Sequence, residues 1–110
     1  MAEFINAIAI SRAEALKAIS SGIPTEICKA LVSIAFHEKD WVWAQNQFIP
    51  LLRSDDYEIA GLAATCLGHI ARIHGKIDKE KVLPALQSLR DNPNISGQAE
   101  DAIDDILMFT

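Results

Sequence analysis

The sequence predicts an all-α fold of one domain over residues 1–110, and composition and spacing both support this. Half of the 110 residues are hydrophobic and 23% are charged, which is typical of a folded domain and excludes a disordered segment. The chain holds 16 Ala, 15 Ile and 10 Leu, but only three Val and three Thr. Alanine favours helices, whereas strand-rich domains favour β-branched and aromatic residues. Apolar residues also recur at spacings of three and four, as they do on one face of a helix.

Boundary signals predict where the first helices begin and end. Six helices are expected, over residues 11–20, 24–37, 41–53, 57–74, 79–90 and 96–108. Ser11 and Glu14 have the spacing of a capping box, which starts the first helix, although this helix could reach back to Phe4. Gly22 follows it where a left-handed residue is favoured. Asp40 is expected to cap the third helix.

Similar signals bound the later helices. Asp55 and Glu58 again have capping-box spacing, which predicts the start of the fourth helix. Gly75 follows that helix as its expected left-handed C-terminal residue. Asp78 is expected to cap the fifth helix. The sixth helix is predicted from its apolar spacing alone.

A repeat of 36 residues runs through the second, fourth and sixth helices. Aliphatic residues recur in register at three positions, and the residue before the middle position is always small. The sets are Ile23/Ile59/Ile95, Leu31/Leu67/Ile103 and Ile34/Ile70/Ile106, with Ala30, Cys66 and Ala102 as the small residues. Their spacing places them on one helical face, which we expect to be buried. The repeat therefore predicts a short α-solenoid of three stacked helix-turn-helix units, over residues 11–37, 41–74 and 79–108.

Proline and glycine recur inside the predicted helices. Phe48-Ile-Pro-Leu-Leu matches Val82-Leu-Pro-Ala-Leu, and each proline removes one backbone hydrogen bond and bends its helix. Gly61 and Gly68 each cost about 1 kcal/mol relative to alanine inside a helix. We expect that another helix approaches closely at both glycines, because such an approach would offset the cost.

The order of these features resembles a known repeat. The second unit reads Phe48-Ile-Pro-Leu-Leu, then Asp55-Asp56, then Ile59-x-Gly-x-Ala-Ala-x-Cys-Leu-Gly. This pattern resembles a HEAT-type helical repeat, in which a proline-bent helix, an aspartate turn and an alanine-rich helix stack into a solenoid. The third unit, with Pro84, Asp91-Asn92-Pro93 and Gly97-x-Ala99, fits nearly as well, whereas the first fits only in its second helix. The resemblance implies a fold and no particular function.

The net charge of −5 lies entirely in the last twenty residues. Residues 1–90 hold ten acidic and ten basic side chains, whereas the last twenty hold five acids and no Lys or Arg. This balance opposes binding to nucleic acid or anionic lipid. No apolar run approaches the roughly 18 residues of a membrane span, and the N-terminus lacks the basic flank of a signal peptide. With Cys28 and Cys66 expected as buried reduced thiols, we expect a cytoplasmic protein that binds neither nucleic acid nor membrane.

Nothing in the sequence predicts an enzyme, a metal site or a cofactor. His69 and His74 are five residues apart, which is not the spacing that places two imidazoles on one metal. Arg72 shares a helical face with His69 and would disfavour a cation there. His37 lies near the C-terminal end of a predicted helix, where the helix dipole favours a positively charged side chain. No Ser/His/Asp arrangement or Gly-rich phosphate loop is present.

Acidic residues of the last helix are the first candidates for partner binding. Glu100 with Asp104, and Asp101 with Asp105, form like-charge pairs four residues apart. Each pair destabilises an isolated helix by roughly 0.2–0.5 kcal/mol. Because no basic residue is nearby in the sequence, these pairs indicate that a basic partner contacts this helix.

Aromatic residues near acids complete the candidate site. Trp41 and Trp43 point roughly 200° apart on a helix, so one is expected to be buried and the other at least partly exposed. The partly exposed Trp is either a binding anchor or a cover for a neighbouring helix. Tyr57 lies between two acids in the aspartate turn. The predicted partner-binding residues are Asp101, Asp104, Asp105, Asp56, Tyr57 and Trp43.

Size, acidity and helical-repeat character are similar to those of bacterial immunity proteins of toxin systems, including contact-dependent growth inhibition. The resemblance implies an inhibitor that binds a basic cognate toxin, often a nuclease, and covers its active site. The alternative is an adaptor or scaffold that docks a partner through an apolar or aromatic surface. A third hypothesis is self-association through the ends of the array.

Overall fold

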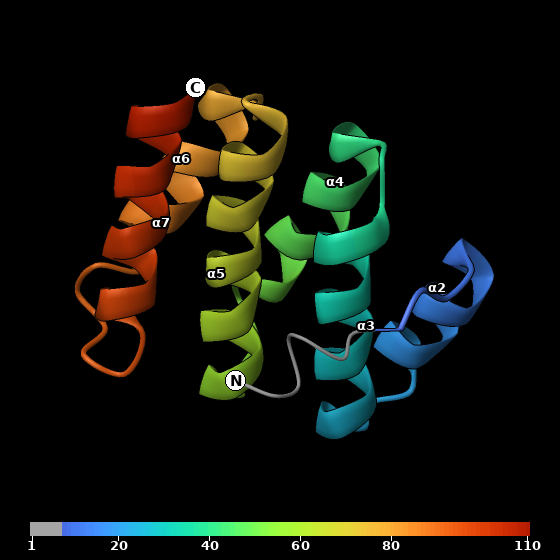
Figure 1. The fold of residues 1–110 in the computed structure, drawn as a ribbon. Helices are drawn as coiled ribbons and strands as arrows, with labels where there is room; N and C mark the ends of the chain where they lie inside the picture. The colour runs from blue at the N-terminus through green and yellow to red at the C-terminus, as the bar shows by residue number, and fades with distance from the viewer. Residues whose placement is uncertain (1–7) are drawn as a thin grey trace.

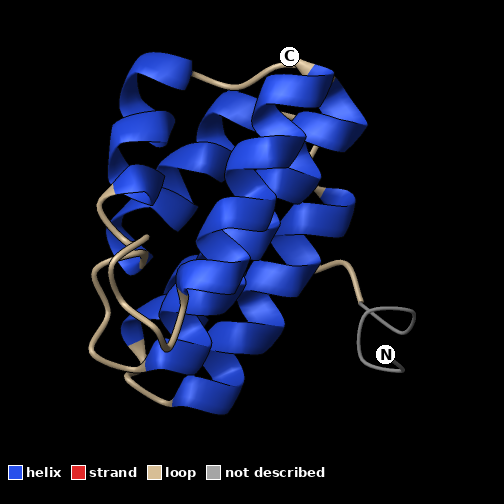
Figure 2. Cartoon of the chain, turned by 90° about the vertical axis from the view of Figure 1, so that its left-hand side faces the viewer, coloured by secondary structure: helices blue, strands red, loops and turns tan. Residues whose placement is uncertain are grey.

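The computed structural model describes residues 8–110, and in this range the chain forms six helices and no strand (Figures 1 and 2). The helices are α2 (Arg12–Ser20), α3 (Pro24–His37), α4 (Trp41–Leu51), α5 (Tyr57–His74), α6 (Lys79–Gln87) and α7 (Ser96–Phe109). The predicted all-α fold class is confirmed. The suggested extension of the first helix to Phe4 lies outside the described residues.

The helices α3, α5 and α7 lie side by side, with α4 and α6 behind them and α2 against α3 (Figure 1). Contacts between neighbours join residues about one repeat apart. The thiol of Cys66 in α5 lies 3.8 Å from the carbonyl oxygen of Leu31 in α3. Arg72 of α5 forms an ion pair with Asp105 of α7, which is again about one repeat later in the sequence. His69 likewise meets Phe36, and Gly61 meets Gln98. The sequence offset between contacting residues is therefore similar along each pair of helices, which shows that the three helices run parallel.

The repeat positions form the core, with one exception. The residues at the second and third aliphatic positions and at the small position are all buried, namely Leu31, Leu67, Ile103, Ile34, Ile70, Ile106, Ala30, Cys66 and Ala102. At the first position Ile59 and Ile95 are buried, but Ile23 is 51% exposed. The prediction that Ile23 is buried is wrong, because α3 has no earlier second helix beside its N-terminus.

Most predicted caps are confirmed, and one is corrected. Ser11 and Glu14 form the capping box of α2, and Gly75 ends α5 in the left-handed conformation. Asp40 and Asp78 accept backbone N–H groups at the starts of α4 and α6. The prediction that Asp55 and Glu58 form a capping box is wrong. Asp56 caps α5 instead, through its contacts with the N–H groups of Glu58 and Ile59.

The proline-containing helices end earlier than predicted. The helix predicted over 41–53 ends at Leu51, and the one predicted over 79–90 ends at Gln87. Beyond each proline the chain forms hydrogen bonds that span three residues, as is common at the C-terminal ends of helices. The N–H of Arg53 donates to the carbonyl of Pro50, and the N–H of Leu89 to that of Leu86.

Two buried polar side chains tie the helices to loops. Gln45 of α4 is almost fully buried, and its Oε1 accepts the N–H of Asp78 at 2.9 Å, just before α6. Ser33 of α3 donates its hydroxyl to the carbonyl of Ile8 at 2.7 Å. Because a buried amide or hydroxyl is costly without a partner, these contacts fix the positions of both loops.

Both cysteines are free thiols. Cys66 is buried as expected, whereas Cys28 is only half-buried. Burial raises the pKa of both thiols, so both are protonated at neutral pH. Among the described helices, none is long and apolar enough to cross a membrane.

Candidate partner-binding surface

The structure separates the predicted binding residues into three places. Asp101, Asp104 and Asp105 lie on α7 at one end of the array. Trp43 lies on α4 and contacts Arg12 of α2. The helix α2 is at the opposite end of the array from α7 (Figure 1). Asp56 and Tyr57 lie at the N-terminus of α5, between these ends. The six residues therefore do not form one patch.

The acids of α7 are partly neutralised within the chain. Asp105 is half-buried, and its Oδ2 lies 3.7 Å from Nε of Arg72 on α5. Glu100 Oε1 lies 3.9 Å from Nε of Arg90, beyond the end of α6. For these two acids the chain itself supplies a nearby cation, so their like-charge spacing does not by itself indicate a basic partner. Asp101 and Asp104 are exposed and form no ion pair within residues 8–110.

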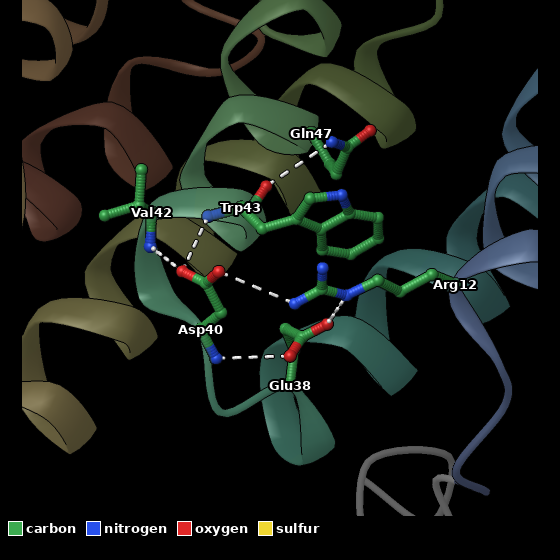
Figure 3. Close-up of polar contacts among 6 residues, drawn as sticks. All are labelled: Arg12, Glu38, Asp40, Val42, Trp43 and Gln47. Atoms are coloured by element: carbon green, nitrogen blue, oxygen red, sulfur yellow. Dashed lines mark hydrogen bonds and ion pairs between the residues drawn. The ribbon is translucent and has the colours of Figure 1, made fainter.

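Trp43 is covered by a cation from α2 (Figure 3). The guanidinium carbon of Arg12 lies 4.6 Å from the centre of the Trp43 ring. The same guanidinium contacts Glu38 at 2.7 Å and Asp40 at 3.6 Å. Hydrogen bonding to Arg12 lowers the pKa of Glu38, so this carboxylate keeps its charge to a lower pH than an ordinary glutamate does. The cluster holds α2 against the turn between α3 and α4, and it gives Trp43 a structural role.

The two tryptophans have similar surroundings. Trp41 and Trp43 are both half-buried and pack against the core. The prediction that one of them is buried is wrong, because α4 lies partly at the surface and covers the core with its aromatic side chains. The partial exposure expected of the other is confirmed. Tyr57 is the most exposed of the predicted aromatic residues, at 49%.

A groove between α3 and α5 is a surface feature that the sequence did not reveal. It has a volume of about 750 Å³ and reaches α7 at Gln98. Its walls include the apolar residues Ala35, Phe36 and Leu62. Such a volume lies within the range of clefts that hold small ligands, roughly 300–1,000 Å³. We call it the α3–α5 groove.

An aromatic pair lies in the wall of this groove. The ring centres of Phe36 and His69 are 4.6 Å apart, with the planes tilted by 40°. Burial lowers the pKa of His69, and the charges of Arg72 and His74 lower it further. The imidazole is therefore uncharged at neutral pH. The expectation that Arg72 disfavours a cation at His69 is confirmed.

The groove is lined by one acid and one base, and only the base has an ion-pair partner among the described residues. Glu58 and Arg72 are its two fully charged lining residues, and Arg72 is paired with Asp105. Glu58 is exposed and forms no ion pair in the described part of the chain. Burial is the largest cause of the raised pKa of Cys28, and the negative charges of Asp56 and Glu58 raise it further. Two carboxylates are thus close to one end of the groove.

A second groove lies on the other layer, between α4 and α6. It has a volume of about 580 Å³, and both helix prolines, Pro50 and Pro84, line it. Its charged residues are Arg53 and Lys81, and no acid lines it. We call it the α4–α6 groove. The α4–α6 groove is therefore lined by cations alone, whereas the unpaired charge in the lining of the α3–α5 groove is the carboxylate of Glu58.

No group of three or more His, Cys, Asp or Glu side chains that could hold a metal ion is found within residues 8–110. His37 is the last residue of α3, at the helix end where the sequence placed it.

Comparison with known proteins identifies one informative solved structure. The chain superposes on a chain in the crystal structure of a CDI complex from Cupriavidus taiwanensis with a TM-score of 0.84. The two sequences are 33% identical, and the match covers 94% of each chain. No protein-family model matches the sequence, and no curated protein matches it. The HEAT-type resemblance and the division into three repeats stay predictions.

Proposed function

Because this chain belongs to the same family as a chain of the Cupriavidus taiwanensis CDI complex, we propose that it is an immunity-type protein of a contact-dependent growth inhibition system. In this role it binds a toxin domain in the cytoplasm and blocks the toxin's active site, without catalysis of its own. The observation that carries the proposal is the match over 94% of both chains at 33% identity. A likeness of helical packing alone would not require such sequence identity.

Charge supports a basic toxin as the partner. The chain has a net charge of −5, and the excess acid lies in the last twenty residues. Asp101 and Asp104 are exposed on α7 without ion pairs among the described residues. Carboxylates in these positions attract a cationic surface over several ångströms and speed its encounter with the chain. A nuclease, whose active site attracts phosphates, is a toxin of this kind.

The direct test of the proposed function is complex formation. The open reading frame next to this chain in its genome is expected to encode a basic domain that stops growth when expressed alone. Co-expression of the two proteins and size-exclusion chromatography should yield a stable 1:1 complex. A neighbouring domain that neither stops growth nor elutes with this chain would contradict the proposal.

The acids of α7 are expected to act on the association rate. We predict that the double substitution Asp101→Asn and Asp104→Asn slows association with the toxin domain about three- to tenfold at low salt. The variant should also show a flatter dependence of the rate on salt from roughly 50 to 500 mM. Stopped-flow or biosensor kinetics measure both effects.

A matched control separates location from net charge. Glu26→Gln with Glu80→Gln removes the same charge from exposed positions on α3 and α6. This control should change the rate by less than twofold. Equal slowing in both variants would mean that only the overall charge matters. An association rate that does not depend on salt in the unmodified protein would instead favour the alternative, an adaptor that docks its partner through an apolar surface. The exposed Phe36 in the α3–α5 groove belongs to such a surface.

A further inference from the structure

We propose that the α3–α5 groove binds a toxin segment in which an apolar or aromatic side chain is followed closely by a lysine or arginine. The inference rests on the proposed function and identifies the part of this chain that receives the toxin. Three properties of the groove lead to this partner chemistry: its apolar wall, its unpaired carboxylates and its contrast with the α4–α6 groove.

The apolar wall of the groove can bind a large apolar side chain. Phe36 is 46% exposed, and it stacks against His69 at the lip of the groove. Leu62 and Ala35 continue the apolar wall beside it. The volume of about 750 Å³ exceeds what a single side chain fills, so a short peptide segment fits better than one residue. Burial of an aromatic anchor in such a pocket is typical of the strongest contacts in protein interfaces.

The carboxylates that remain unpaired set the charge of the occupant. Arg72, the cation of the groove wall, is neutralised by Asp105. Glu58 has no ion pair in the described residues, and Asp56 lies near enough to affect the same thiol. On α7, Asp101 is three residues after Gln98 and four before Asp105, so it lies on the edge that faces α5. The acidic groups therefore lie at the N-terminal end of α5 and on the neighbouring edge of α7, and they favour a cationic segment.

The charges that line the α4–α6 groove make it a poor site for this segment. It is of comparable size, at about 580 Å³, and it also has apolar walls. However, Arg53 and Lys81 are its charged residues, and they would repel a lysine or arginine. Shape alone would allow either groove, whereas charge selects the α3–α5 groove for a basic partner.

A matched pair of charge reversals tests the inference. Glu58 and Glu80 are both exposed, and each is the second residue of its helix. An aspartate caps both helices. Glu58→Arg and Glu80→Arg therefore lose the same interaction with a helix N-terminus, and they differ in their location. We expect Glu58→Arg to raise the Kd for the toxin domain at least tenfold. Glu80→Arg should change it less than twofold, as measured by calorimetry.

A second pair tests the apolar wall. Phe36→Ala is expected to raise the same Kd at least tenfold, whereas Leu16→Ala, at a similarly exposed position on α2, should leave it within twofold. Circular dichroism melting of each variant shows whether it is folded. Hydrogen exchange of the unmodified chain gives an independent readout: toxin binding should protect amides of α3 and α5 around the groove and not those of α4 and α6.

The possible outcomes separate the two proposals. If the unmodified chain does not bind the toxin domain, both the proposed function and this inference fail. If it binds but neither Glu58→Arg nor Phe36→Ala weakens binding, the inference alone is overturned. Protection confined to α4 and α6 would overturn the inference in the same way, even if both variants failed to fold.

Discussion

Gly68 sets the distance between α5 and α7. A Cβ atom at this position would lie 3.0 Å from Oδ2 of Asp105 and 3.2 Å from Cα of Ala102. The second contact is with backbone, which cannot move aside without shifting α7. The close approach expected from the sequence is therefore confirmed at Gly68, and at Gly61 the side chain of Gln98 occupies the space.

Substitution of Gly68 should destabilise the fold by overpacking. We predict that Gly68→Leu lowers the free energy of unfolding by about 1–3 kcal/mol, measured by urea denaturation. Gly97→Ala is the control, because no heavy atom lies within 4 Å of its Cβ position. That variant should be neutral or more stable by up to about 1 kcal/mol, since alanine is the better helix former. Equal stability of Gly68→Leu and the unmodified chain would show that α5 and α7 are not in close contact.

His69 should make stability depend on pH. Burial lowers its pKa in the folded chain, so the unfolded chain binds a proton more readily. Stability is therefore fully present above the unfolded pKa of about 6.5 and decreases as pH falls below it. We predict that His69→Gln loses less stability than the unmodified chain between pH 7.5 and pH 5, in thermal melts at both values. An identical loss in the two proteins would contradict this assignment.

At the scale of single helices, the sequence predicted element positions well because the signals are local. The caps by Ser11, Asp40 and Asp78 involve residues within one helical turn, and so does the end of α5 at Gly75. Errors arose where two local signals competed. Asp55 and Asp56 could each cap α5, and the capping-box spacing favoured the wrong one. Pro50 and Pro84 lie inside α4 and α6 as expected, but both helices end within three residues of them.

The two aspartates before α5 can be distinguished by mutation. Asp56 accepts N–H groups of Glu58 and Ile59 at 2.9 and 3.4 Å, which are otherwise unsatisfied donors of the first turn. We predict that Asp56→Ala lowers the free energy of unfolding by about 0.5–2 kcal/mol. Asp55→Ala should change it by less than about 0.5 kcal/mol, because Asp55 is exposed. The reverse order in chemical denaturation would restore Asp55 as the cap.

At the scale of the whole molecule, the candidate site was less predictable than the core. The 36-residue repeat indicated which residues would be buried, because each copy uses the same helical face. Contacts between copies also follow the repeat: Arg72 meets Asp105, and Gly61 meets Gln98. The first pair is 33 residues apart, three fewer than the repeat, so a search at the exact repeat length would have missed it. By contrast, the contact between Arg12 and Trp43 does not follow the repeat, so the sequence did not predict it. The α3–α5 groove depends on how two helices pack, which the sequence pattern does not specify.

The most direct test of the central claim is growth of a bacterium that expresses the neighbouring toxin domain from an inducible promoter. With this chain co-expressed, growth should continue at the rate of cells without toxin, and Glu58→Arg at equal protein level should protect less. If cells that contain the intact, folded chain stop growing as fast as cells that lack it, the chain is not an immunity protein and the account is wrong.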